Sequence, residues 1–247
     1  MIPKIIHYCW LSDDRIPFKL NEYMKTWDIY LRDYEKKHWN FSIFDINQSI
    51  WVKEAFENKK YAFAADYIRL YALYHFGGFY LDMDVEVLKS FNPLLRLPIV
   101  LCWEKDSDGL EVAALGVEPK SPIIKVCMER YHNRHFIMEN GELDTKVLPI
   151  IVKKTLIENG YILVNVNNID EAISIKEKNM IPVFPPEYFS PKSYKNGQTK
   201  TTINTYCIHH FAGSWLTNKQ KVYKLTLHLL GDKCTNYLYK FISKLFS

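Results

Sequence analysis

Two aspartates directly follow a short apolar strand in the sequence Gly77-Gly78-Phe79-Tyr80-Leu81-Asp82-Met83-Asp84. Side chains alternate between the two faces of a strand, so an unbroken strand would place Asp82 and Asp84 on the same face. Like charges at that spacing repel each other unless a cation or a proton compensates them. A divalent ion such as Mn²⁺ or Mg²⁺ meets this need, because it prefers oxygen ligands and also binds phosphate oxygens. The alternative is a turn at the end of the strand, with both aspartates in solvent.

The segment before this strand predicts a strongly apolar helix over residues 62–76, which Gly77 and Gly78 would end. Within it, Asp66 and Arg69 have the spacing that places two side chains on one face of a helix. A buried structural ion pair is one interpretation of these charges. The other is a sugar site, because a carboxylate and a guanidinium group together offer acceptors and donors to hydroxyl groups.

Strands and helices alternate along the rest of the chain. We expect strands at residues 4–10, 39–44, 99–103, 110–117 and 206–215, helices at 21–37, 50–60, 121–134 and 144–159, and a Pro-rich surface run at 183–189. This order predicts an α/β fold with a mostly parallel central sheet flanked by helices, whose ligand site lies at the carboxyl ends of the strands. We expect one domain over residues 1–217 and a tail over residues 218–247.

Composition limits the class of protein. A chain of 247 residues with 48% hydrophobic and 15% aromatic residues is expected to fold as a globular protein. A net charge of +4 without a long basic tract does not indicate a nucleic-acid partner. The five cysteines show no Cys-x-x-Cys pair, and we interpret them as reduced thiols. No signal-peptide pattern follows Met1 and no apolar run is long enough to span a bilayer, so we expect a cytoplasmic protein, or at most a peripheral one.

The last part of the chain has a different character. From Lys219 onward there are six lysines and one acid, Asp232, and apolar side chains recur at helical spacing. This pattern predicts a basic amphipathic helix. Such a helix would either lie on an anionic membrane surface, at the inner face of the cell membrane, or pack on the protein's own core.

The two central motifs together resemble the sugar-binding region of the DXD-motif glycosyltransferases. The resemblance is carried by Ala64-Ala65-Asp66-Tyr67-Ile68-Arg69 and by residues 77–84. It is strongest to glycosyltransferase family 32, the Och1-like mannosyltransferases and capsular polysaccharide enzymes, and more distant to the catalytic domains of large clostridial glucosylating toxins. The opening Ile2-Pro3-Lys4-Ile5-Ile6-His7-Tyr8-Cys9-Trp10 is similar to the first strand of that family, and residues 209–215 are similar to its closing motif. The resemblance implies a GT-A fold.

It also implies roles for individual residues. Asp66 and Arg69 would hold the transferred sugar, Tyr80 would line its pocket, and Asp82 and Asp84 would serve the ribose, diphosphate and metal. We count Asp66, Arg69, Asp82 and Asp84 as the catalytic set. The further donor-binding residues would be His7, Trp10, Ser214 and Trp215, with Trp10 stacked on the base unless it is a core aromatic.

The expected metal ligands are Asp82, Asp84 and His210. A neutral imidazole suits a site for Mn²⁺ beside carboxylates. The sequence has two adjacent candidates, His209 and His210. We favour His210, because His210-x-x-Gly213 is similar to a motif of other retaining GT-A enzymes. The closing motif differs from that of the toxins, which have a glutamate and a serine near the metal.

These features predict a metal-dependent, retaining hexosyltransferase that uses a nucleotide-sugar donor, UDP rather than GDP, with Mn²⁺ or Mg²⁺ as cofactor. The resemblance implies a glycan or lipid-linked glycan as acceptor, in surface or capsular polysaccharide synthesis. Glu104, which follows the strand at 99–103, would either orient the acceptor or lie exposed, and we favour the exposed surface. The alternatives are a metal-dependent phosphohydrolase or nucleotidyltransferase, and a non-catalytic peripheral membrane protein.

Overall fold

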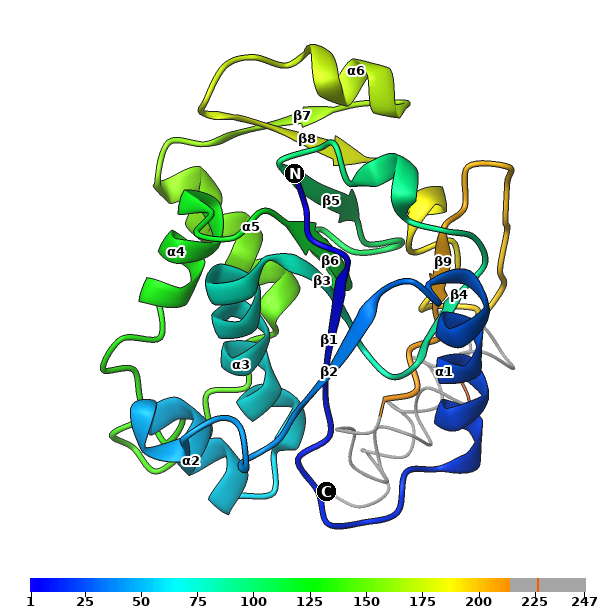
Figure 1. The fold of residues 1–247 in the computed structure, drawn as a ribbon. Helices are drawn as coiled ribbons and strands as arrows, with labels where there is room; N and C mark the ends of the chain where they lie inside the picture. The colour runs from blue at the N-terminus through cyan, green and yellow to red at the C-terminus, as the bar shows by residue number, and fades with distance from the viewer. Residues whose placement is uncertain (214–225, 227–247) are drawn as a thin grey trace.

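The computed structural model describes residues 1–213 and Thr226, and its centre is a seven-stranded sheet with helices on both faces (Figure 1). The strands are β1 Ile5–Cys9, β2 Glu35–Trp39, β3 Gly78–Leu81, β4 Val85–Val87, β5 Ile99–Trp103, β6 Leu110–Val117, β7 Ile162–Asn165, β8 Met180–Phe184 and β9 Cys207–His209. The α-helices are α1 Phe18–Tyr30, α2 Ile50–Glu57, α3 Tyr61–Phe76, α4 Pro122–Glu129, α5 Leu148–Glu158 and α6 Ile169–Ser174. Three short 3₁₀ turns, Ile46–Gln48, Asn92–Leu94 and Pro186–Tyr188, complete the described elements.

The large sheet has the strand order β2-β1-β3-β6-β5-β8-β7. β1 pairs in parallel with β2 and β3, and β8 pairs in parallel with β5 and β7. β6 pairs antiparallel with both β3 and β5, so it alone runs against the other strands of this sheet. β4 and β9 form a separate antiparallel pair. The predicted α/β fold with a mostly parallel central sheet flanked by helices is confirmed.

The alternation of side chains along β3 divides the core in two. Tyr80 belongs to a hydrophobic cluster with residues of α2, α3, α4 and α5, whereas Phe79 and Leu81 belong to a second cluster with residues of α1 and the Pro186–Tyr188 turn. A strand with both faces buried cannot shift by one residue without moving every side chain to the wrong face. The position of the two aspartates after β3 is therefore fixed by the packing of the strand before them.

The glycine pair between α3 and β3 holds this strand against β1. Gly77 ends the helix with a φ of 63°, and Gly78 follows with a φ of 94°. A Cβ atom at Gly78 would lie 2.6 Å from the carbonyl oxygen of Ile5. Only glycine combines this backbone conformation with such a close approach.

Four predicted segments were wrong, and one of them, the strand expected over 206–215, covers only residues 207–209 of the described chain. The expected helix over 21–37 ends at Tyr30, and the strand that follows it lies at 35–39 rather than 39–44. Leu31 and Tyr34 fit a helical spacing, but they are buried in the turn between α1 and β2, where they pack in the second cluster. The expected surface run at 183–189 is buried instead, because Val183 and Phe184 belong to the inner strand β8.

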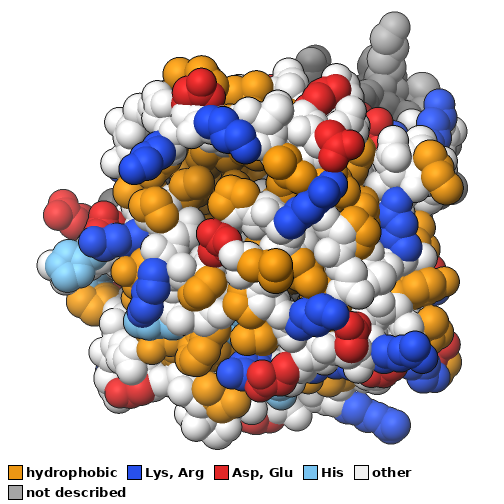
Figure 2. Space-filling view, turned by 45° about the horizontal axis from the view of Figure 1, so that its top comes forward, with side chains coloured by type: hydrophobic (Ala, Val, Ile, Leu, Met, Phe, Trp, Pro, Cys, Tyr) orange, Lys and Arg blue, Asp and Glu red, His pale blue; other side chains and the backbone are white. Residues whose placement is uncertain are grey.

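The remaining surface carries both charges and apolar groups. Figure 2 shows one face on which hydrophobic side chains lie in the middle, with lysine, arginine and acidic side chains scattered around them. Among the described residues, no helix has both the length and the apolar character needed to cross a bilayer. Residues 218–247 fall outside the described residues except for Thr226, so the predicted tail and its boundary at residue 217 stay predictions.

Candidate active site

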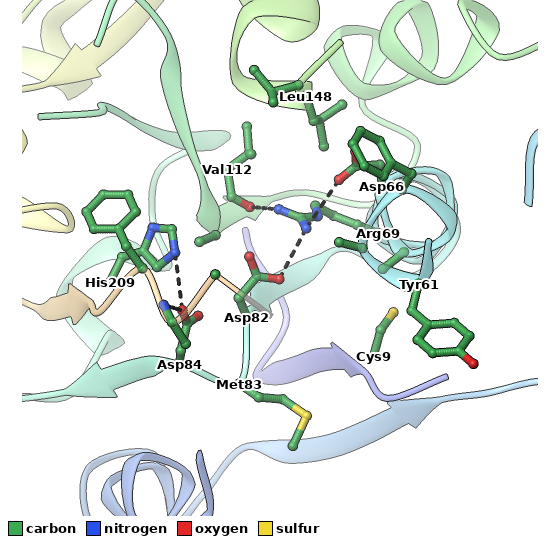
Figure 3. Close-up of a pocket in the computed structure, with 18 of the residues that line it drawn as sticks. Cys9, Tyr61, Asp66, Arg69, Asp82, Met83, Asp84, Val112, Leu148 and His209 are labelled. Carbon is green, nitrogen blue, oxygen red and sulfur yellow. Dashed lines mark hydrogen bonds and ion pairs between the residues drawn. The ribbon is translucent and has the colours of Figure 1, made fainter. Parts of the chain in front are cut away.

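A buried arginine links the two motifs of the sequence. Arg69 lies on α3, and its Nη1 donates a hydrogen bond of 2.6 Å to the carbonyl oxygen of Val112 on β6. Its Nη2 donates to Oδ1 of Asp82 at 3.1 Å and lies 3.5 Å from Oδ1 of Asp66. The guanidinium carbon also lies 4.3 Å from the ring centre of Tyr80. Figure 3 shows this arginine between the two carboxylates, so the predicted pair Asp66 and Arg69 is also joined to the DXD motif.

The carboxylates beside Arg69 have raised pKa values. Burial raises the pKa of Asp66 to about 7, and the charge of Arg69 opposes this rise. Burial also raises the pKa of Asp82, to which the neighbouring charge of Asp84 adds. The same carboxylates raise the pKa of Arg69 against the effect of its burial, so Arg69 stays charged. The cluster therefore contains one fixed positive charge and acids whose ionisation depends on what binds beside them.

The chain turns between the two aspartates instead of continuing as a strand. The N–H of Val85 donates to the carbonyl oxygen of Asp82 at 3.0 Å, which closes the turn. Asp82 consequently points toward Arg69, whereas Asp84 points toward β9 and accepts a hydrogen bond of 2.6 Å from the N–H of Ala212. The turn corrects the expectation of an unbroken strand. Because of this turn the two carboxylates have different partners, Arg69 for Asp82 and the backbone of Ala212 for Asp84.

His209 is the histidine that lies beside the aspartates. One ligand atom each from Asp82, Asp84 and His209 lie within 4.8 Å of one another, and Nε2 of His209 is 3.6 Å from Oδ2 of Asp84. Burial lowers the pKa of His209, but the charges of Glu111 and Asp84 outweigh it and raise the pKa to about 10. Two carboxylate oxygens and one imidazole nitrogen are a donor set that fits a divalent ion such as Mn²⁺.

His210 points away from this group. Its Nε2 lies 2.7 Å from Oε2 of Glu86, and its ring stacks on Tyr23 with ring centres 4.1 Å apart. Only its backbone N–H reaches the motif, donating to the carbonyl oxygen of Asp84 at 3.0 Å. Neighbouring residues at the end of a strand face opposite sides, so His209 and His210 do not both reach Asp84. The structure thus brings together Asp82, Asp84 and His209 rather than the expected set with His210.

Two glutamates lie near His209: Glu111, which was not expected in the site, and Glu104, for which an exposed position was favoured over a role at the acceptor. Glu111, at the start of β6, is almost fully buried and lies 3.1 Å from Nδ1 of His209 through Oε2. Glu104 is half-buried and lines the cavity, so the expectation of an exposed surface residue is wrong. Burial and the nearby charge of Glu111 raise the pKa of Glu104 to about 7. Burial favours a raised pKa for Glu111 too, but the charge of His209 lowers it on balance.

These residues line one cavity of about 640 Å³. Its lining includes Cys9, the last residue of β1, and Trp10 and Leu11, which follow that strand. Trp10 is half-buried, and its indole Nε1 donates to the carbonyl oxygen of Asp14 at 2.8 Å, which leaves the ring at the wall of the cavity. A cavity of this size accommodates a ligand larger than a single sugar.

Part of the cavity lining is apolar. The residues there come from α3 and the start of α5: Tyr61, Ala62, Phe63, Val147, Leu148 and Pro149. Figure 3 shows Leu148 on one side of Arg69 and Tyr61 on another, beside Cys9. Apolar side chains therefore border the polar cluster on more than one side.

His7 does not line the cavity. Its side chain is fully buried, its Nε2 lies 2.7 Å from the carbonyl oxygen of Gly77, and its Nδ1 accepts a hydrogen bond of 3.0 Å from Trp39. Burial lowers its pKa to about 4, so it is neutral. These contacts give His7 a structural role and not the predicted donor-binding one. Ser214 and Trp215 lie outside the described residues.

Comparison with known proteins agrees with this site. Residues 17–98 match the family described as glycosyltransferase sugar-binding region containing DXD motif. This span contains Asp66, Arg69, Asp82 and Asp84, the four residues of the expected catalytic set. At the level of class, the chain is therefore similar to DXD-type glycosyltransferases.

Individual relatives are named for mannosyl transfer. A mannosyl phosphorylinositol ceramide synthase of Saccharomyces cerevisiae is 34% identical over 98% of this chain and 59% of the yeast protein. An inositol phosphoceramide mannosyltransferase of Schizosaccharomyces pombe is 23% identical over 99% of this chain and 69% of that protein. Among solved structures, the PaToxG glycosyltransferase matches with a TM-score of 0.48 and 18% identity, over 64% of this chain and 70% of that one. The chain thus spans little more than half of its yeast relative.

Proposed function

We propose that this protein is a metal-dependent glycosyltransferase that transfers a hexose, of the mannose type, from a nucleotide-sugar to a lipid-linked or glycan acceptor. The observation that carries the proposal is the hydrogen bond from Arg69 to Asp82, which joins the sugar-binding pair of α3 to the DXD turn. A hydrolase that acts on phosphates alone has no evident use for the Asp66 and Arg69 pair. The mannose part of the proposal rests on the printed names of the relatives.

The polar cluster around Arg69 would hold the donor's sugar and diphosphate. Asp66 offers carboxylate oxygens to sugar hydroxyls, and Arg69, anchored to Val112 through Nη1, keeps Asp66 and Asp82 in place through Nη2. Trp10, which lines the cavity, offers an aromatic surface for the base. The acceptor would then contact the apolar lining residues and Glu104, whose connection to β6 lies beside Pro149.

Asp82, Asp84 and His209 would hold the cation. When bound, a divalent ion supplies positive charge to the leaving diphosphate, which becomes more negative as the glycosidic bond breaks. Arg69 is a second fixed positive charge on the same side of the cavity. We propose Mn²⁺ as the ion and retention of the anomeric configuration, as the resemblance implies. No residue needs to act as a strong base if the departing phosphate accepts the proton of the acceptor hydroxyl.

The donor base is the least constrained part of the proposal. The family resemblance favours UDP, and mannosyl transfer by the relatives makes GDP-mannose the donor to test beside UDP-hexoses. A location of the protein at the inner face of the cell membrane and a role in surface polysaccharide synthesis also remain predictions. The alternative of a non-catalytic membrane protein is disfavoured by the intact polar cluster around Arg69.

The test is nucleotide binding followed by turnover. Binding of GDP and UDP is measured by calorimetry with and without Mn²⁺ on the wild type, on Asp84→Asn and on Asp170→Asn. Asp170 is a matched control, since it is an exposed aspartate paired with Arg96 outside the cavity. We expect Mn²⁺-dependent binding that Asp84→Asn weakens at least tenfold and Asp170→Asn leaves unchanged, together with slow hydrolysis of one nucleotide-sugar. Hydrolysis of simple phosphate esters without any nucleotide-sugar turnover would overturn the proposal in favour of a phosphohydrolase.

A further inference from the structure

The inference concerns Glu111, a buried carboxylate that the roles given above leave unused. Glu111 is 1% exposed and lies at the beginning of β6 between hydrophobic neighbours. A carboxylate in such a place is costly unless its oxygens have partners. Both oxygens do: Oε1 accepts the N–H of Ala113 at 2.8 Å, and Oε2 lies 3.1 Å from Nδ1 of His209.

The first of these contacts fixes the second. Ala113 lies on the same strand as Glu111, so the bond from its N–H holds the carboxylate to the backbone of β6. The carboxylate cannot follow His209 if the imidazole moves. It therefore acts as a fixed acceptor on the protein side of the ring.

His209 is held on its other sides as well. Its backbone pairs with Val85, the residue directly after the DXD turn, and its ring lies against Phe211 with ring centres 4.0 Å apart. With Nδ1 turned toward Glu111, the other nitrogen, Nε2, is the one that faces Asp84 at 3.6 Å. Figure 3 shows this orientation of the ring toward Asp84.

We propose that Glu111 is a positioning residue of the cation site: by accepting the Nδ1 proton of His209 it aims the free Nε2 atom at the space beside Asp82 and Asp84. A histidine ligand whose second nitrogen donates to a carboxylate is a more basic and better oriented ligand, and loss of such a partner typically weakens metal binding by about 10- to 100-fold. The inference rests on the proposed function, because it needs His209 to be a ligand. It assigns a role to a residue outside the DXD motif and outside the matched span 17–98.

Glu104 provides a matched control for charge. Ligand atoms of Glu104, Glu111 and His209 lie within 4.8 Å of one another, so both glutamates place a negative charge beside the imidazole. Of these two glutamates, only Glu111 is hydrogen-bonded to His209 in the described part of the chain. Glu104→Gln therefore removes a nearby charge and keeps the bond, whereas Glu111→Leu removes both.

The experiment measures Mn²⁺ affinity in the presence of the nucleotide that binds, by electron paramagnetic resonance of free Mn²⁺, on full-length wild type, Glu111→Leu, Glu111→Gln and Glu104→Gln. We expect a loss of 10-fold or more in Glu111→Leu, and a smaller loss in Glu111→Gln, whose amide oxygen still accepts from Nδ1. Glu104→Gln is expected to lose less than Glu111→Leu. Circular dichroism checks that each variant is folded. If Glu111→Leu does not fold, the comparison of Glu111→Gln with the wild type still tests the proposal.

A second readout follows the imidazole directly. In ¹H–¹⁵N spectra of histidine-labelled protein loaded with Zn²⁺ as a diamagnetic probe, the Nδ1 proton of His209 should show the downfield shift of a hydrogen-bonded proton in the wild type and in Glu111→Gln, and lose this shift in Glu111→Leu. Equal Mn²⁺ affinities in wild type and both Glu111 variants would overturn the positioning role while leaving the proposed function intact. A wild type that binds nucleotide but shows no Mn²⁺ site would overturn both.

Discussion

Replacement of Arg69 by methionine tests whether the buried arginine holds the site together. Methionine fills a similar volume and keeps a contact with the ring of Tyr80, but it removes the hydrogen bonds to Val112 and Asp82 and the charge beside Asp66. Two carboxylates then remain at a buried position without a cation. Loss of one partner from a buried ionic cluster costs about 3–5 kcal/mol, which is a fall in melting temperature of about 6 to 20 °C for a chain of this size.

The size of the loss should depend on pH. The folded-state pKa of Asp66 is already about 7, because of burial, and it rises further when Arg69 is gone. A carboxyl group whose pKa is higher in the folded protein than in the unfolded chain supports the folded state at low pH, and this support is lost as the pH rises through the folded pKa. Arg69→Met should therefore be less destabilising at pH 5 than at pH 8.

The assay is urea unfolding of wild type, Arg69→Met and Arg69→Met/Asp66→Asn at pH 5 and pH 8. The double variant removes one of the two stranded charges and should recover part of the loss at pH 8, since neighbouring substitutions of this kind are not additive. A loss of the same size at both pH values, with no recovery in the double variant, would refute the reasoning. The cost would then come from packing alone.

Three further predictions use other contacts. Gly116→Ala should destabilise the protein by about 1–3 kcal/mol in urea unfolding, because its Cβ would lie 2.3 Å from a ring carbon of Phe79; no loss would show that β3 and β6 can move apart. His210→Ala should leave the Mn²⁺ affinity measured by electron paramagnetic resonance unchanged, and should lower the stability of the protein because the contact with Glu86 is lost. A loss of Mn²⁺ binding in this variant would show instead that His210 is a metal ligand. Asp66→Asn should gain stability relative to wild type between pH 4 and pH 8, by on the order of 1 to 4 kcal/mol, as the raised pKa of Asp66 requires; a flat difference across this range would contradict that pKa.

Sequence patterns predicted the middle of the fold well. The helix over 62–76, the glycine break and the strand before the DXD motif are all present within one residue of the expected bounds. β3 is apolar on both faces because it lies between the two hydrophobic clusters, and α3 contributes its buried residues to the first of them. Continuous apolar runs of this kind are easily recognised. The failures included the end of α1, β2 and β8. β2 lies at the edge of the sheet and has the polar sequence Glu-Lys-Lys-His-Trp, which shows no clear strand alternation.

The expected catalytic residues could be proposed from the sequence because they lie close together in the chain. Asp66 and Arg69 are one helical turn apart, and Asp82 and Asp84 follow the next strand. The choice between His209 and His210 could not be made in this way, because it depends on which face of β9 meets Asp84. Glu111 was missed for a related reason, since its partner His209 lies 98 residues away in the sequence. A lone acid inside the otherwise apolar β6 was the signal that was available.

The reversed direction of β6 has a consequence for how this enzyme class can diversify. Trp103 pairs with Leu110, so residues 104–109 form the connection of a hairpin between β5 and β6, and Glu104, Asp106 and Ser107 in it border the cavity. A hairpin connection can change in length or composition without altering the pairing of its strands or the helices behind them. Evolution can therefore reshape this rim, and with it the set of molecules admitted to the cavity, while the arginine cluster and the DXD turn stay as they are. Under the proposed function, grafting the corresponding hairpin from a relative onto this chain tests whether these residues select the acceptor.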